Sequence, residues 1–307
     1  MAVTDLHLLH SVTHDATQIP GINRVSMNTG GQLRADGGCA KVYPEFVGLV
    51  DQSANAQFDT TALSVALGLC GLSGTDVGST TNGIIFWEKK LTDGGGIAAG
   101  SVHRKIAAKD GLLVLRSLAV SERGDAVLSY ELLVTYDGVN APYVITGSQS
   151  LPAVAANTER YGLGPVKIGN VTISQVASYT LDFGVNVEVT QADGDIYPTF
   201  AAITRIAPSL TVRGKNATWL DSSAIPLAGL ACTHANTIFY CRRRSSGGGY
   251  VADNQSSHVK CTMAGMAQIT TAFDANGVDA GEAAIEVRGT YDGSNAPVVV
   301  ATGQQIT

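Results

Sequence analysis

The sequence predicts a mainly β protein with two similar units in tandem. The octapeptide at residues 135–142 returns at residues 290–297, 155 positions later, with a single change of Val to Ser. The strand pattern before each copy keeps the same alternation of apolar and polar residues, as it must if one face is buried. The 35 glycines and many Thr, Val and Ser residues favour strands joined by tight turns. We expect one helix in each unit.

Composition and charge limit the classes of protein to which this chain can belong. The 307 residues suffice for two domains, and 45% hydrophobic with 15% charged residues is typical of a globular chain. A net charge of −6 argues against a general nucleic-acid binder. No stretch reaches the roughly 20 apolar residues of a membrane span, and no signal-peptide pattern opens the chain. We therefore expect synthesis in a cytoplasm, no membrane partner, and five reduced cysteines.

The repeat offset sets the expected boundaries. We expect an N-terminal arm at residues 1–21, a first domain at 22–150, a linker at 151–169 and a second domain at 170–307. His7, His10 and His14 lie at helical spacings in the arm. These histidines could bind a metal, but an arm or short helix with surface histidines is favoured, because no cysteine or carboxylate completes a ligand set.

Within each domain, a Tyr-Pro-x-Phe motif comes first, at residues 43–46 and 197–200. Proline in such a position favours a strand edge or a strand start. Residues 58–71 then predict the best helix of the chain, capped by Asp59 or Thr60 and ended by Gly71. Its counterpart at residues 216–221 is expected to be short, because Pro226 follows.

Further along, the strands at residues 84–90 and 237–243 each lead to a triple glycine. The triplets lack the Gly-Lys-Ser/Thr that follows in a phosphate-binding loop, and their β flanks argue against a dinucleotide fingerprint. We predict flexible hairpin tips at Gly94, Gly95, Gly96, Gly247, Gly248 and Gly249.

Each octapeptide is predicted to connect the two strands of a closing β-hairpin. Its Asp-Gly pair supplies positive φ, and Asn and Pro suit the rest of a short loop. Before the first copy, alternation separates an apolar face from a mainly polar one, which also includes Leu133. The polar positions are Ser129, Glu131 and Thr135 in the first half and Glu286, Arg288 and Thr290 in the second.

Candidate chemistry is sparse. The duplicated His103 and His258 could form a catalytic pair, but each is followed by a lysine and lacks a nearby carboxylate, so structural histidines on a strand face are favoured. Three arginines at residues 242–244 could bind phosphate; a charged strand end, at a subunit contact, is favoured. We predict a protein that is not an enzyme, with no catalytic residue, cofactor or metal.

With the Tyr-Pro-x-Phe motif, the helix, the glycine-tipped hairpins and the closing strands, both halves resemble the tail-tube family of tailed bacteriophages. The resemblance implies two tandem β-sandwich or barrel domains, each with one flanking helix. In that family the inner sheet of each domain joins its neighbours' in a ring around a channel, and chains with two domains form pseudo-sixfold trimers. This implies a structural protein of the virion tail.

The resemblance also implies partners. The chain would bind itself in rings and stacks, meet other tail proteins at the tube ends, and let DNA pass without specific binding. A tail hub or baseplate component of the same fold is the first alternative. A carbohydrate-binding adhesin module is the second, although it would need exposed aromatic residues and only 6% of the chain is aromatic.

Two expectations follow for a tube. Glu131, Glu286 and Arg288 are candidates to face the channel, where carboxylates would repel DNA phosphates; a solvated outer face is the equal alternative. The two glycine triplets are expected to order against the next ring, because glycine loses much backbone freedom on ordering.

Overall fold

The structure, a computed structural model, describes residues 5–37, 39, 41–78, 80–192, 194–215, 224–274 and 281–307. Over these ranges the protein is mainly β, with antiparallel sheets and a single short helix, α1 (Leu63–Leu69). The sequence therefore predicts the secondary-structure class correctly. The second helix expected at residues 216–221 lies outside the described residues.

A five-stranded flanking sheet belongs to each half of the chain. The first runs β2–β1–β8–β9–β12, with bounds Thr17–Ile19, His7–His14, Ile84–Lys90, His103–Ala108 and Val144–Gln149. The second runs β14–β13–β20–β21–β24, with bounds Val171–Ile173, Tyr161–Ile168, Thr237–Arg243, His258–Met263 and Val298–Gln304.

Ten strands from both halves form one continuous sheet, which we name the shared sheet. Its order is β3–β6–β11–β10–β15–β18–β23–β22–β19, and β7 (Thr75–Asp76) also pairs with β10. The nine strands of this order span Ile22–Asn28, Asn55–Thr60, Val127–Thr135, Asp110–Ser121, Val176–Asp182, Ser209–Gly214, Glu282–Gly289, Gly265–Asp274 and Leu230–Cys232.

The strand order of the first half returns in the second. In the shared sheet, β3–β6–β11–β10 corresponds to β15–β18–β23–β22, and the short β7 corresponds to β19. In the flanking sheets, β2–β1–β8–β9–β12 corresponds to β14–β13–β20–β21–β24. The sequence repeat is therefore matched by a repeated topology.

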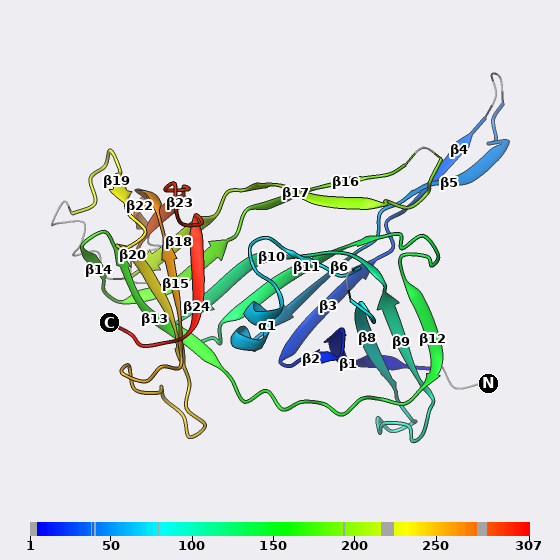
Figure 1. Cartoon of the computed structure of the whole chain (residues 1–307), viewed down its shortest axis with the longest axis horizontal. Helices are drawn as coiled ribbons and strands as arrows, with labels where there is room; N and C mark the ends of the chain where they lie inside the picture. Colours follow the sequence, from blue (N-terminus) through cyan, green and yellow to red (C-terminus); the bar gives the residue numbers. More distant parts are fainter. Residues whose placement is uncertain are drawn as a thin grey trace.

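Each half also has a long hairpin outside these sheets. One is β4 (Gly31–Asp36) with β5 (Phe46–Gln52), and the other is β16 (Val185–Thr190) with β17 (Phe200–Ile206). Figure 1 shows that β16 and β17 run back over the first half, whereas β4 and β5 project away from the body.

Two expected boundaries are wrong. Residues 7–19 form β1 and β2 rather than an arm, because β1 pairs with β8 along its whole length. Likewise, the expected linker at 151–169 contains β13, which pairs with β20. His7, His10 and His14 thus lie on a strand, where their helical spacing has no meaning.

The octapeptides are not hairpin turns. β11 pairs with β10 and β6, but the strand after the octapeptide, β12, pairs with β9 in the first flanking sheet. β23 and β24 are separated in the same way. The Asp-Gly pair predicts a turn correctly, but each loop carries the chain from one sheet to another.

The predicted helix start is also displaced. β6 extends through Thr60, so α1 begins only at Leu63. Asp59 accepts a hydrogen bond from the hydroxyl of Ser129 (2.6 Å) instead of capping the helix. Pairing of β6 with its neighbours thus overrides the local capping signal.

The core lies between the shared sheet and the flanking sheets. In the first half, the Phe58 ring on β6 lies 5.1 Å from the Tyr130 ring on β11 and 6.2 Å from the Phe86 ring on β8. In the second half, the Tyr179 ring on β15 lies 5.3 Å from the Phe239 ring on β20. These contacts tie each flanking sheet to the shared one.

Replacement of Phe58 by Ala is expected to lower the free energy of unfolding by about 3–5 kcal/mol, because it removes both ring contacts and leaves a cavity. Phe46→Ala, at an exposed position, is the control and should change it by no more than about 0.5 kcal/mol in the isolated chain. Denaturant unfolding measures both; equal effects would show that Phe58 is not a core residue.

Candidate assembly interface

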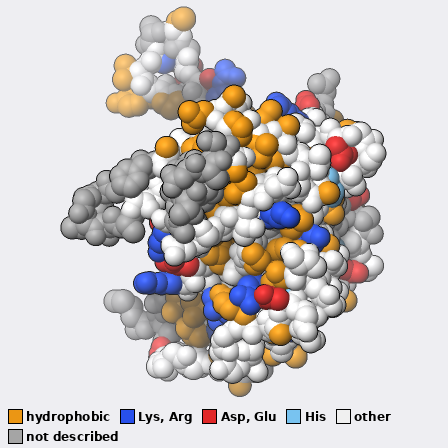
Figure 2. Space-filling view, turned by 90° about the vertical axis from the view of Figure 1, so that its left-hand side faces the viewer, with side chains coloured by type: hydrophobic (Ala, Val, Ile, Leu, Met, Phe, Trp, Pro, Cys, Tyr) orange, Lys and Arg blue, Asp and Glu red, His pale blue; other side chains and the backbone are white. Residues whose placement is uncertain are grey.

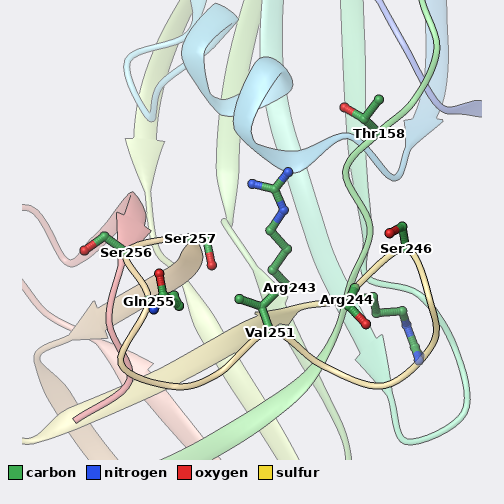
Figure 3. A pocket seen from close by; sticks show the side chains of 9 residues that line it. Thr158, Arg243, Arg244, Ser246, Val251, Gln255, Ser256 and Ser257 are labelled. Carbon is green, nitrogen blue, oxygen red and sulfur yellow. The ribbon is translucent and has the colours of Figure 1, made fainter.

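The arginine triplet borders a shallow pocket of about 440 Å³ lined by Thr158, Arg243, Arg244, Ser245, Ser246, Val251, Gln255, Ser256 and Ser257. Figure 3 shows the Arg243 and Arg244 side chains pointing in different directions. Arg242 lies 2.6 Å from Asp253, Arg243 3.8 Å from Glu159, and Arg244 2.9 Å from Asp125. All three guanidinium groups therefore have carboxylate partners, which disfavours a phosphate site.

The duplicated histidines are structural. Nδ1 of His103 accepts a hydrogen bond from the backbone N–H of Lys90 (3.1 Å), and Nδ1 of His258 accepts one from that of Arg243 (3.0 Å). Both side chains are buried. Each histidine thus fixes the end of the preceding strand at equivalent places in the two halves.

Four of the five free cysteines are buried, and Cys39 is exposed. Burial raises the pKa of the Cys70 thiol to about 11 and that of the Cys241 thiol to about 12. Reactive thiolate is therefore scarce in the interior at neutral pH. The described residues contain no cluster of three or more His, Cys, Asp or Glu side chains arranged to hold a metal ion.

The strongest candidate site is instead the junction between the halves. β10 and β15 pair over five residues, from Ser117 opposite Asp182 to Ser121 opposite Ser178. Backbone bonds extend the ladder at both ends, from Phe183 N to Arg116 O (3.0 Å) and from Glu122 N to Ala177 O (2.8 Å). The junction is thus a β-ladder in which the edge strand of one half continues the sheet of the other.

The repeat equivalents of the two joined strands lie at or near the two ends of the shared sheet: β3 corresponds to β15, and β22 corresponds to β10. Within the described ranges, β3 pairs only with β6, although its counterpart β15 is paired on both sides. Strand β22 pairs with β19 only at residues 265–267, just as β7 covers β10 only at Leu112 and Leu113. The rest of the outer edge of β22 has no paired strand among the described residues.

One face of the shared sheet carries most of its polar side chains, although Val114 lies opposite Glu131 on this face and Leu112 opposite Leu133. The registers align Glu131 with Gln57, Thr180 with Thr211, and Thr211 with Glu286, whereas Tyr130, Leu132, Ile285 and Val287 are buried on the other face. The alternation predicted from sequence is confirmed. Whether this face lines a channel stays a prediction.

Glu131 and Glu286 on this face each have an arginine partner. Glu131 is buried and accepts hydrogen bonds from Arg116 Nε (2.6 Å) and Asn55 Nδ2 (3.2 Å). Glu286 accepts one from Nε of the exposed Arg288 (2.9 Å). Burial of Glu131 does not fit the expectation that its carboxylate faces a channel. Glu286 is paired with Arg288, so neither glutamate is a free carboxylate on this face.

The glycine triplets occupy the tips between β8 and β9 and between β20 and β21, as predicted. Gly95 N donates to Thr92 O (3.0 Å), and Gly248 N donates to Ser245 O (3.3 Å). Gly94, Gly95, Gly248 and Gly249 have positive φ, and open space surrounds all six glycines except Gly96, which lies beside Thr92. Contact with a further ring stays a prediction for Gly94, Gly95, Gly96, Gly247, Gly248 and Gly249.

The octapeptides form two ordered loops of the same kind. Asp137 Oδ1 accepts from the backbone N–H of Val139 (2.8 Å) and Asn140 (2.5 Å). Asp292 accepts from Ser294 (2.9 Å) and Asn295 (2.6 Å) in the same way. Hydrogen bonds from the Asn295 side chain and these N–H groups lower the pKa of Asp292 to about 2. Each loop begins beside one tyrosine, Tyr136 or Tyr291, at equivalent positions of the repeat.

A comparison with protein-family models and with curated protein sequences finds no match for this chain. Within the described ranges, no helix has the length and apolar character needed to cross a membrane.

Sequence reasoning missed the edge residues of β3 and β22 as functional candidates. Strand alternation marks which face a side chain occupies, but it carries no information on which strand lies at a sheet edge. The offset of 154 or 155 positions between the halves was the available signal, since it links β15 to β3 and β10 to β22.

Thiol reactivity tests the burial of the cysteines. At neutral pH we expect one fast-reacting thiol per native chain, that of Cys39, and five in denaturant. Burial shields the four interior thiols from the reagent, and it raises the pKa of Cys70 and Cys241. Titration with a chromogenic disulfide measures the count, and Cys39→Ser should abolish the fast reaction. Fast reaction of a second thiol in the native chain would contradict the structure.

Proposed function

We propose that this protein is the subunit of a bacteriophage tail tube, with two tandem β-sandwich domains of tail-tube type, residues 7–149 and 161–304. Its rings stack to form a channel that conducts DNA. The observation that carries the proposal is the β10–β15 junction together with the outer edges of the counterpart strands β3 and β22, which are wholly or partly open among the described residues.

The two open edges are complementary because the halves repeat. If β15 fits β10 within the chain, then β3 of one chain fits β22 of another by the same geometry. Such a head-to-tail contact uses two different surfaces, so it either closes into a ring or propagates. Three chains supply six domains, which gives the pseudo-sixfold trimer that the sequence resemblance implies. Closure also removes the exposed strand edges that otherwise promote aggregation.

The internal junction predicts the register between chains. Ala119 lies opposite Thr180, and it also lies opposite Val127. In the second half, Asp274 occupies the place of Ala119, since it lies opposite Glu282. Ser26 occupies the place of Thr180. Asp274 of one chain is therefore expected directly opposite Ser26 of the next.

The polar face of the shared sheet supports its assignment to the channel wall. The flanking sheets cover the apolar face of the shared sheet. In a ring of shared sheets, the side toward the axis is therefore either the polar face, with side chains such as Gln57, Thr180 and Glu286, or the flanking sheets. A polar wall with paired charges offers passing DNA few unpaired cations, and so little of the salt-dependent affinity that neutralised phosphates provide.

A tail hub of the same fold would form the same ring but would not stack with itself. Microscopy of assembled protein separates the two, because a tube subunit extends into long stacks. An adhesin module would bind a saccharide and remain functional without a ring.

The register makes a charge test possible. Ser26→Asp places a carboxylate opposite Asp274 and should weaken assembly by about 1 kcal/mol per junction, because like charges directly opposite destabilise a β-ladder. Ser26→Lys, the matched control, should assemble as well as the unaltered chain. Ring formation is measured by native mass and negative-stain microscopy.

The double variant Ser26→Asp with Asp274→Lys should restore assembly. Ser26 and Asp274 are both exposed in the single chain, so none of these changes should alter its thermal unfolding. A chain that stays monomeric at high concentration in every form would contradict the proposed function; equal assembly of all forms would contradict this register.

A second test addresses the channel wall. Glu286→Lys should leave tubes intact but make them retain linear DNA at low salt, because each added cation attracts phosphate. Glu286 is preferred to Glu131, whose removal would leave Arg116 without its carboxylate. Ile145→Lys on the first flanking sheet, at an exposed position, is the control. Equal DNA retention by the two variants would place Glu286 away from the channel.

A further inference from the structure

The β4–β5 hairpin exposes apolar side chains that a single chain leaves uncovered. Val42 is 88% exposed, Tyr43 81% and Phe46 63%. Figure 1 shows the hairpin projecting from the body, and Figure 2 shows hydrophobic side chains on the faint lobe that stands apart from the rest of the molecule. Exposed apolar groups gathered on one projecting element commonly mark a protein contact.

The counterpart of this hairpin is already docked within the chain. The Tyr197 ring lies 5.5 Å from the ring of Tyr136 in the first octapeptide loop. The carbonyl oxygen of Pro198 accepts a hydrogen bond from Tyr136 N (2.8 Å), and that of Ile196 accepts one from Gln52 N (2.9 Å). Pro198 is buried as a result. The β16–β17 hairpin thus clasps the first half through its Tyr-Pro-x-Phe motif.

The two hairpins leave the shared sheet by the same turn. Gly30 and Gly184 both have positive φ, and a Cβ on either would collide with a carbonyl oxygen, that of Ser53 or that of Ala207. In each case only two residues separate the hairpin from the preceding strand, β3 or β15. A strand that joins a neighbouring sheet edge therefore carries its hairpin to that neighbour.

The second half has a surface equivalent to the one that receives the docked hairpin. Tyr291 in the second octapeptide loop corresponds to Tyr136, and it is 66% exposed. Ile206 corresponds to Gln52. Tyr43 and Pro44 correspond to Tyr197 and Pro198, so both sides of a second clasp are present in the chain but face solvent.

We propose that the β4–β5 hairpin of one chain clasps the second half of a neighbouring copy, with the Tyr43 ring packed on Tyr291. The backbone N–H of Tyr291 donates to Pro44 O, and that of Ile206 donates to Val42 O. The clasp rests on the proposed ring in one respect. The chain whose β3 pairs with β22 of its neighbour is the same chain whose β4–β5 hairpin clasps that neighbour.

One contact of the internal clasp has no counterpart between chains. Gln191 Nε2 donates to Asp51 Oδ1 (2.5 Å), whereas Gly37 and Arg205 stand at the equivalent positions. The clasp between chains therefore depends on the aromatic pair and the two backbone hydrogen bonds, which makes the tyrosines the side chains to test.

Cross-linking tests the clasp directly. In a Cys39→Ser background, Tyr43→Cys with Tyr291→Cys should give covalent dimers and trimers with a short bismaleimide. The matched control is Tyr43→Cys with Val139→Cys, which places an equally accessible thiol on the first octapeptide loop, where the β16–β17 hairpin already lies. It should give at least tenfold less linked product.

The outcomes separate this inference from the proposed function. Rings with no more 43–291 product than the control would overturn the clasp and leave the ring intact. Linked chains without rings would support the clasp and count against the tube. Monomers that neither link nor assemble would overturn both.

A second pair of variants compares the two clasps. Tyr43→Ala should weaken association between chains about tenfold, since an aromatic pair and its buried area are lost, and should leave the melting temperature of the isolated chain unchanged. Tyr197→Ala should lower that melting temperature instead. Tyr43→Phe should assemble normally. A Tyr43→Ala chain that associates as tightly as the unaltered one would overturn the clasp.

Discussion

Backbone hydrogen bonding at strand edges is the constraint on which this structure depends. An edge strand presents a row of N–H and C=O groups that need partners. Between the halves the need is met by pairing β10 with β15, which fuses eight long strands into one sheet. That pairing sets where the second half lies, carries the β16–β17 hairpin over the first half, and leaves two matching edges at the ends of the sheet.

The repeat and the alternation could be read from the sequence because both depend on local order. The buried face of Tyr130 and Leu132 and the polar face of Glu131 follow from a period of two residues, and the structure agrees. The hairpin tips at the glycine triplets also follow from local backbone preference, since Gly95 and Gly248 adopt positive φ.

The predictions that were wrong concern strand pairing between segments far apart in the sequence. Asp137 and Gly138 signal a turn, yet nothing nearby in sequence says that β12 joins a different sheet from β11. The histidines of residues 7–14 suggested helical spacing, but β8 supplies a partner strand that fixes the segment as β. The pairing of Glu131 with Arg116 was hidden for the same reason, because a bulge between Leu115 and Ser117 brings the arginine to that face.

The covalent link between the halves also lowers the contact strength that the internal junction needs. Strands tethered in one chain meet at an effective concentration far above that of free chains, typically millimolar for short flexible linkers. Ladder contacts at the internal junction can therefore be weak without loss of the sheet, whereas contacts made between separate molecules cannot. Under the proposed ring, Ala119 and Thr180 at the internal junction would tolerate substitution more readily than Ser26 and Asp274, although one duplication relates the four positions.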